Sequence, residues 1–426
     1  MEIRVDQLRN ALEILKPAVP RHPTLPILKN VLVKDGQMMA TDLESMVIIS
    51  MPELDEPFLL PYAEVFKMLK YVPGYEKLHI HPEKGKLTLT WSNGDGSYPA
   101  EKVKDFPDIP VLKVKDEADI DGDTFIPALA SALPYVARDE ARPVLAGVTV
   151  QFGGPIEISA GDGFRMAHIV LPLEFPAEHT TIIPAGAIAT LLHVMAKTPR
   201  TPPQGEVLVD IIMAKRQLHV ALDGKNALIV GFSPSVKVII KLIEGSPPAW
   251  LKLFPKGKPV LKAQFFAREL ETAVRRIADV ASQNKDIARL QFQDGACRVS
   301  AKAEGREVAA QVSILDLEGE PFRVALQVGY LLEYLKGKEG IVTMTSTGES
   351  APAAFNHSRS PKVLIMPMMA AWEDQPPPDQ AEPEAAAEPT EAPAEAAQEP
   401  PEAPAPAAPK AATSKSKRQN GNKVTK

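Results

Sequence analysis

The chain has 426 residues, of which 45% are apolar, and this is the composition of a globular protein with two or three domains. Its formal charge of -6 argues against a surface that is basic throughout, although an acidic exterior around a basic channel gives the same total. A single cysteine, Cys297, excludes an internal disulfide framework and a cysteine-rich metal site. No run approaches the roughly 20 apolar residues of a membrane span, so we expect no membrane contact and a cytoplasmic location.

Three amphipathic helices are expected along residues 1–372, each at the start of a similar succession of elements. In each helix the apolar residues fit one helical face. Pro134 lies within the second helix, which is expected from Pro127 to Arg138, so that helix is predicted to be kinked or short. The three apolar stripes are Val5, Leu8, Leu12 and Leu15; Leu129, Leu133 and Val136; and Leu270, Val274, Ile277 and Ala281.

A strand-like run follows each of these helices, beginning at Pro26, Pro143 and Ile287. The first two runs, PILKNVLV and PVLAGVTV, share the pattern P-[IV]-L-x-x-V-x-V. A second helix is then expected in PYAEVFKMLKYV, PAGAIATLLHVMAK and QVGYLLEYLKGK, before further strands. Two helices and several antiparallel strands per unit predict an α+β fold with the helices on one face of a sheet. We therefore predict three similar domains, at residues 1–121, 122–254 and 255–372.

Residues 373–426 are rich in Pro, Ala and Glu and end in the basic tip KAATSKSKRQNGNKVTK. Such a segment holds almost no residue that could enter a core, so it is predicted to be disordered. A solubilising tail is a better interpretation than a specific binding arm.

The sequence holds no strong catalytic or metal-binding motif. The HIH run from His79 to His81 suggests no third ligand, so histidines that face solvent are favoured over a metal site. GDGFR, which begins at Gly161, lacks the lysine and Ser/Thr of a phosphate-binding loop and is interpreted as a turn. No Ser/His/Asp order or paired carboxylates stand out, so we expect a binding protein without a cofactor, a metal or an enzyme activity.

Several motifs, taken in order, resemble one known family. They are RHPTLPILKNVLV with ATDLES, RPVLAGVTV with SAGDGFRMA, LIEGSPPAWLKLFP, and VLIMPMM near the end of the third unit. Together they resemble the bacterial DNA polymerase III beta subunit, the replicative sliding clamp, over about residues 1–372. The resemblance implies three topologically alike clamp domains per protomer, and two protomers arranged head to tail in a ring around duplex DNA.

The chain departs from the family pattern at three positions. Gly161 replaces the usual threonine of the TDG.R turn, Phe164 occupies a typically polar position, and Asp286 stands where pocket-rim aromatics can occur. These changes indicate a divergent member and leave open which partner motif it prefers, and whether it is a chromosomal clamp or a copy from a mobile element.

The resemblance implies a cleft between the second and third domains into which polymerases, the clamp loader and repair factors insert a short linear motif. Flexible, polarisable methionines suit such a groove, because they can repack around different side chains. A plain buried strand is the alternative interpretation of VLIMPMM. The residues implied for the cleft are Leu145, Gly163, Phe164, Arg165, Met166, Pro248, Leu253, Gln327, Tyr330, Leu364, Ile365, Met366, Pro367 and Met368.

Basic residues on and near the helices are predicted to face DNA through its phosphates, without sequence readout. An ordinary solvated helix face is an equally good interpretation of any one of them. They are Arg9, Lys16, Arg21, His22, Lys67, Lys70, Arg138, Arg142, Lys197, Arg275, Arg276 and Lys336.

The sequence therefore predicts a processivity clamp without catalytic activity. Its expected partners are double-stranded DNA, the DNA polymerase III alpha subunit, the clamp loader, other proteins with a clamp-binding motif, and a second copy of the chain. A second hypothesis is a clamp-derived adaptor that binds partner peptides but does not encircle DNA. A third is an enzyme with an unrecognised site.

Overall fold

The structure is a computed structural model that describes residues 1–139, 141–200, 216–293, 295–358, 361–370 and 372. Met1–Ala370 is one compact unit, separate from Ala371–Lys426. The tail predicted at residues 373–426 lies outside the described residues. Among the residues that are described, no helix is long and apolar enough to cross a membrane.

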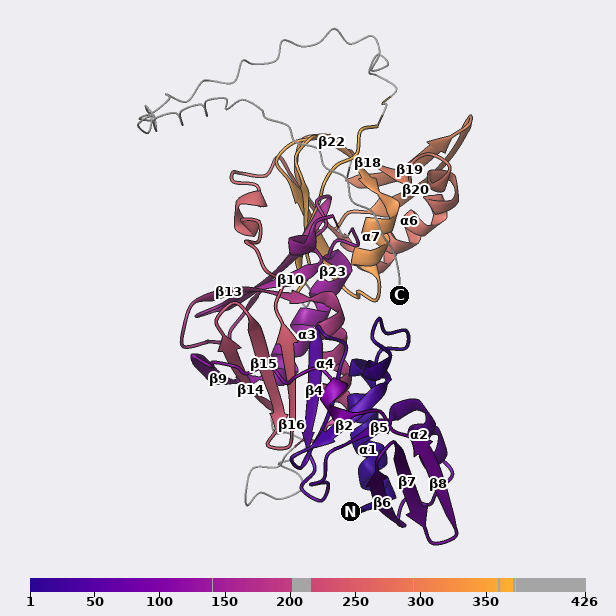
Figure 1. The fold of residues 1–426 in the computed structure, drawn as a ribbon. Coiled ribbons are helices and arrows are strands. Elements are labelled where there is room, and N and C mark those ends of the chain that lie inside the picture. Colours follow the sequence, from indigo (N-terminus) through magenta and orange to yellow (C-terminus); the bar gives the residue numbers. More distant parts are fainter. Residues whose placement is uncertain (140, 201–215, 294, 359–360, 371, 373–426) are drawn as a thin grey trace, which may run out of the picture. The chain divides into compact units, whose positions relative to one another are not determined.

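Within Met1–Ala370 one succession of elements occurs three times: a strand, a helix, four strands, a helix and three strands (Figure 1). Repeat 3 also contains a short extra strand, β21 (Asp316–Gly319). Repeat 1 contains β1 (Glu2–Arg4), α1 (Val5–Leu15), β2 (Asn30–Lys34), β3 (Gln37–Thr41), β4 (Ser45–Ser50), β5 (Phe58–Pro61), α2 (Tyr62–Leu69), β6 (Lys77–Glu83), β7 (Lys86–Trp91) and β8 (Gly94–Pro99). Repeat 2 contains β9 (Asp116–Asp121), α3 (Gly122–Ala132), β10 (Gly147–Phe152), β11 (Ile156–Gly161), β12 (Arg165–Leu171), β13 (His179–Pro184), α4 (Ala185–Lys197), β14 (Gln217–Asp223), β15 (Ala227–Ser233) and β16 (Val236–Lys241). Repeat 3 contains β17 (Leu261–Phe266), α6 (Ala267–Ser282), β18 (Ile287–Gln293), β19 (Ala296–Ala303), β20 (Arg306–Ser313), β22 (Phe322–Gln327), α7 (Val328–Leu335), β23 (Ile341–Ser346), β24 (Ala353–Asn356) and β25 (Lys362–Ile365).

The α+β class predicted from the sequence is confirmed. The domain limits remain a prediction, although the strand β9 ends at residue 121 and pairs with β14 of repeat 2. By its strand pairing, repeat 2 therefore begins near Asp116, slightly before the predicted limit.

Antiparallel sheets continue from one repeat into the next. Strands β4 and β16 pair between repeats 1 and 2 and so create an eight-stranded sheet, in the order β5-β2-β3-β4-β16-β15-β14-β9. Strands β12 and β25 pair in the same way between repeats 2 and 3, in the nine-stranded sheet β13-β10-β11-β12-β25-β24-β23-β17-β21. The two remaining four-stranded sheets, β1-β6-β7-β8 and β20-β19-β18-β22, lie within repeats 1 and 3.

The apolar stripes of α1 and α6 are buried as predicted, in one core that also includes residues of repeat 2. The limits predicted for the helix with Pro134 are wrong. The Asp121 side chain caps α3 by accepting a hydrogen bond from Asp123 N at 3.0 Å, so the helix starts at Gly122. It ends at Ala132, before a 3-10 turn, Leu133–Tyr135, that contains Pro134. The helix has 11 residues, as many as α1, so it is displaced towards the N-terminus and not shortened, and Val136 lies beyond it.

The two proline-led runs are only partly strands. Their first halves form 3-10 turns, Pro26–Lys29 and Pro143–Leu145, because proline suits the first position of a helical turn. The strands β2 and β10 follow these turns. His79 and His81 are both exposed on β6, and Gly163 provides the positive φ of 99° that the GDGFR turn requires.

Candidate functional site

The segment that begins at Lys362 is a buried strand that continues into a partly exposed surface. In β25, Val363, Leu364 and Ile365 are at most 3% exposed. Beyond the strand, Met366 is 42% exposed, yet its backbone N still donates a hydrogen bond to Phe164 O at 2.8 Å. The N of Met368 donates to Ala325 O at 2.7 Å. The first half of VLIMPMM is therefore a buried strand, and Met366 in its second half is exposed; the cleft remains a prediction.

Part of the predicted cleft is brought together in one apolar cluster. Leu145, Met166 and Leu364 pack there with Ala137, Trp250 and Ala354, and Phe254 borders them. Next to this cluster, Phe164 is 58% exposed and Leu253 is 51% exposed. The segment that carries Leu253 is the 3-10 turn Trp250–Leu253, which follows Pro248. A buried apolar cluster with exposed apolar side chains beside it can contact the apolar residues of a peptide.

The sequence prediction missed Trp250, which explains the glycine at position 161. A Cβ atom on Gly161 would lie 2.7 Å from Trp250 Cζ3 and 3.1 Å from Met166 Cβ. The indole is 5% exposed, and its Nε1 donates a hydrogen bond to Thr149 Oγ1 at 3.0 Å. The loss of the threonine at position 161 thus leaves room for the tryptophan. The aromatic residue in PPAWLKLFP was the signal available in the sequence.

Arg165 joins repeats 2 and 3 and does not point to the surface. Its side chain is 6% exposed, and its Nε donates to Asp162 Oδ2 at 3.0 Å. Its Nη1 donates to Glu333 Oε2 of α7 at 2.8 Å, and its Nη2 donates to the Pro134 carbonyl at 2.6 Å. Burial by itself lowers the pKa of the guanidinium, but the bonds to Glu333 and Asp162 outweigh it and raise that pKa.

Two more of the predicted cleft residues support the same junction. Gln327 caps α7, because its Oε1 accepts a hydrogen bond from Tyr330 N at 2.7 Å. The Tyr330 ring lies against the Arg165 guanidinium, 4.4 Å from ring centroid to Cζ. Among the predicted cleft residues, this leaves Phe164, Leu253 and Met366 as large apolar side chains that are more than 40% exposed.

Most of the basic residues predicted to face DNA are exposed, with Arg9 as the exception. Arg9 Nη2 donates to the carbonyls of Leu69 and Val72 at the end of α2, at 2.5 and 2.7 Å, so its guanidinium is occupied within the protein. Some exposed members form surface ion pairs, as Arg275 does with Glu271 at 2.6 Å. Such pairs are weak and can be exchanged for phosphate contacts. The exposed members are Lys16, Arg21, His22, Lys67, Lys70, Arg138, Arg142, Lys197, Arg275, Arg276 and Lys336.

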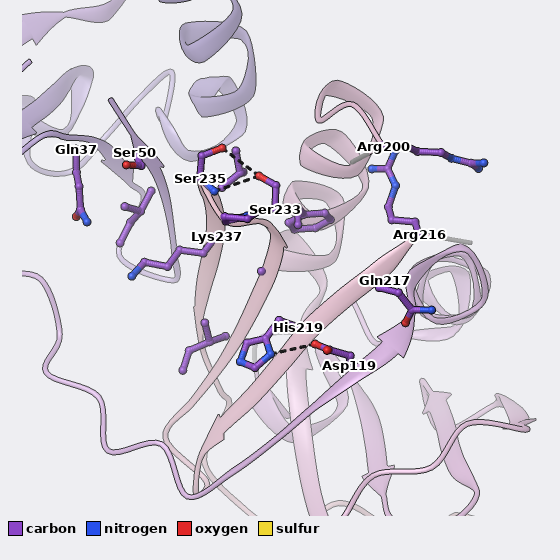
Figure 2. A pocket seen from close by; sticks show the side chains of 16 residues that line it. Gln37, Ser50, Asp119, Arg200, Arg216, Gln217, His219, Ser233, Ser235 and Lys237 are labelled. Atoms are coloured by element: carbon purple, nitrogen blue, oxygen red, sulfur yellow. Dashed lines mark hydrogen bonds and ion pairs between the residues drawn. The ribbon is translucent and has the colours of Figure 1, made fainter. Parts of the chain in front are cut away.

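A cavity that the sequence did not predict lies at the junction of repeats 1 and 2 (Figure 2). It has a volume of about 740 Å³. The residues that line it belong to repeats 1 and 2, the first in the sequence being Gln37 and the last Lys237. His219 Nδ1 lies 3.1 Å from Asp119 Oδ1 within it, as Figure 2 shows. The described ranges contain no group of three or more His, Cys, Asp or Glu placed to hold a metal ion.

Comparison with known proteins supports one family. The chain is 25% identical over 277 residues to the Beta sliding clamp homolog GriR of Streptomyces muensis, which covers 64% of this chain and 68% of that protein. It is 23% identical over 389 residues to the Beta sliding clamp of Pseudomonas aeruginosa, which covers 86% and 98% of the two chains. A solved structure from Eubacterium rectale, described as a putative DNA polymerase III beta subunit, superposes with a TM-score of 0.76 at 15% identity and covers 86% and 98% of the chains. No family model matches the chain.

The three repeats and their shared sheets thus have the fold of a sliding clamp. The resemblance seen in the sequence is confirmed: the chain is similar in sequence to beta sliding clamps and has the fold of solved DNA polymerase III beta subunits.

Proposed function

We propose that the protein is a sliding clamp, in which two copies pair head to tail and close around duplex DNA. In this role it holds the DNA polymerase III alpha subunit, the clamp loader and other motif-bearing proteins at a surface between repeats 2 and 3. It acts in the cytoplasm and catalyses no reaction of its own.

The observation that carries this proposal is the pairing of strands at the two internal junctions. At each junction, the third strand after the first helix of one repeat pairs with the last strand of the following repeat: β4 with β16, and β12 with β25. The corresponding strands of repeats 3 and 1 are β20 and β8. In the described parts of the chain, each of these two strands pairs on one side only, β20 with β19 and β8 with β7. A second copy can complete both edges in the same manner.

The internal junctions also predict the register at this contact. Val236, the first residue of β16, lies opposite Ile49, and Ile239 lies opposite Met46. The equivalent positions in β8 and β20 are found by counting residues from the turns of the β7–β8 and β19–β20 hairpins. They place Gly94 opposite Ala309 and Ser97 opposite Arg306. Bare edge strands invite uncontrolled pairing, and ring closure removes both edges at once.

The acidic total charge is compatible with this role. A closed ring remains on DNA by topological linkage, so its contacts with phosphate need only be weak and screened by salt. The exposed basic residues on the helices, such as Arg275 and Arg276 of α6, provide contacts of this kind. Because they carry no base readout, the ring is free to slide.

The partner surface is formed by Phe164, Leu253 and Met366, above the cluster that contains Leu145, Met166 and Leu364. Its three exposed apolar side chains can act as the few anchors that dominate the hot spots of protein interfaces. Partner peptides gain affinity there mainly by burying apolar surface.

The test of the proposed function is retention on circular DNA. The protein is loaded onto a nicked circular plasmid by a bacterial clamp loader and separated from free protein by gel filtration. We expect it to elute with the circular plasmid and to be released when one restriction cut linearises the DNA. Release from both forms alike would favour the adaptor that binds peptides without encircling DNA.

A further inference from the structure

The junction of repeats 1 and 2 has the same backbone framework as the proposed partner surface between repeats 2 and 3. In the Asp42–Ser45 turn, Asp42 Oδ1 accepts hydrogen bonds from Glu44 N at 3.0 Å and Ser45 N at 2.7 Å. In the Asp162–Arg165 turn, Asp162 Oδ1 accepts the equivalent bonds from Phe164 N at 2.9 Å and Arg165 N at 3.0 Å. In both turns the Asp N donates to the fourth residue's carbonyl at 3.2 Å.

The segment after the last strand is equivalent too. Lys241 N donates to Glu44 O at 2.8 Å, as Met366 N donates to Phe164 O at 2.8 Å. Two residues further on, Ile243 N donates to Ile182 O at 2.9 Å, which corresponds to the bond from Met368 N to the carbonyl of Ala325 on β22. Residues 241–243 thus follow the same path as residues 366–368.

A cavity of about 440 Å³ lies in this framework. That volume falls within the range of about 300–1,000 Å³ that is typical of ligand sites. Its apolar lining includes Met46 and Ile239, which correspond by strand register to Met166 and Leu364 of the partner surface. Both also belong to a buried cluster with Phe106.

Exposed apolar side chains line the same cavity, and one of them is strained. Leu43 is 47% exposed and has a φ of 78°, at the position where the other turn has Gly163. The left-handed region is unfavourable for a residue with a Cβ atom, and strain of this kind tends to persist at functional positions. Val111, which also lines the cavity, is 90% exposed. An apolar ligand that covered both side chains would compensate for their exposure.

The charge around the cavity selects the kind of ligand. Lys241 is its single basic lining residue among those described, and an acidic ligand would meet a strongly negative rim. A ligand with Lys or Arg beside its apolar residues complements this rim. The acidic lining residues are Glu44, Asp108, Asp223 and Glu244.

We propose that this cavity is a second peptide pocket, which binds a short apolar segment flanked by Lys or Arg in a partner protein. The comparison with the partner surface rests on the proposed function, but the cavity, its strained leucine and its acidic rim do not. A clamp with two such pockets per chain could hold two proteins of different charge at once.

The test uses the full-length protein with ¹³C-labelled methionine methyl groups and two probe peptides. The probes are acetyl-Lys-Leu-Ile-Val-Lys-amide and its counterpart with Glu in place of both Lys. Met46 reports on the cavity and Met366 reports on the partner surface. We expect the basic peptide to shift the Met46 signal saturably, and the acidic peptide to bind there about tenfold more weakly.

Two variants separate binding from folding. Leu43→Gly relieves the backbone strain, so it should not lower the melting temperature. It should nevertheless lower the affinity for the basic peptide about fivefold, because it removes apolar contact. The double variant Glu44→Lys, Glu244→Lys should lower the affinity for the same peptide about tenfold. Met366→Gln is the matched control and should leave the Met46 response unchanged.

Three outcomes would overturn the proposal. The first is a Met46 signal that does not move with 1 mM basic peptide, and the second is a response that neither variant weakens. The third is a shift of the Met46 signal, without added peptide, when Lys415, Lys417 and Arg418 are replaced by Glu in the full chain. That result would mean that the basic C-terminal tip of the same chain occupies the cavity. If the peptides shift the Met366 signal but not the Met46 signal, the second pocket is refuted and the proposed function is not.

Discussion

Replacing Arg165 by Ala should destabilise the protein by about 4 kcal/mol, because this side chain holds repeats 2 and 3 together. Its bond to Asp162, whose side chain is 16% exposed, contributes about 1.5–3 kcal/mol, and the Pro134 carbonyl left without its donor costs about 1–2 kcal/mol. Glu333 is 36% exposed, so its ion pair adds at most about 0.5 kcal/mol. Contact of the guanidinium with Tyr330 accounts for the rest.

The change is measured by urea denaturation of both proteins. Arg165→Lys should recover less than half of the loss, because an ammonium group cannot form all three of these bonds in the geometry of the guanidinium. Arg142→Ala is the matched control: this exposed arginine donates a long bond, 3.3 Å, to the Asp162 carbonyl and forms an exposed ion pair with Asp139 at 3.7 Å, so its loss should cost at most about 0.5 kcal/mol. A loss below about 1 kcal/mol for Arg165→Ala would refute this account of the junction.

Three further changes test the packing, the partner surface and the DNA contacts. Gly161→Thr should destabilise the fold by about 1–3 kcal/mol in the same urea assay, because its Cβ would press against the Trp250 ring; an unchanged midpoint would contradict the tight packing. Met366→Gln with Met368→Gln should abolish the binding of polymerase-derived peptides, measured by calorimetry, while the mass in solution stays the same; dissociation into monomers would instead make this run part of the structural core. Arg275→Glu with Arg276→Glu should shorten retention on circular DNA without lowering the melting temperature, and unaltered retention would place both residues away from the DNA.

Periodicity was enough to predict the first helices of repeats 1 and 3, because the apolar residues of the predicted stripes lie on one face and are all buried. It could not place the start of α3, which depends on the cap provided by Asp121. Local turn chemistry of this kind changes an element's limits without altering the apolar pattern around it.

The roles of the cleft residues could be predicted only in part. Leu145, Met166 and Leu364 do form one cluster, and Met366 is exposed beside it. Arg165 was assigned to the same cleft, but its partner Glu333 lies 168 residues further along the chain, so no local pattern could show that it is buried. The pairing of β4 with β16 and of β12 with β25 is equally non-local, and these pairings provide the argument for ring closure.

Cross-linking of the two edge strands tests that ring closure most directly. The only natural cysteine, Cys297, is buried, so cysteines introduced as Ser97→Cys on β8 and Arg306→Cys on β20 can be oxidised selectively. The account predicts that this double variant forms a covalent dimer of about twice 46.2 kDa on a denaturing gel, whereas Ser97→Cys combined with Arg298→Cys on the neighbouring strand β19 does not. A double variant that stays monomeric, or that forms an open ladder of larger species, would contradict the head-to-tail closed ring.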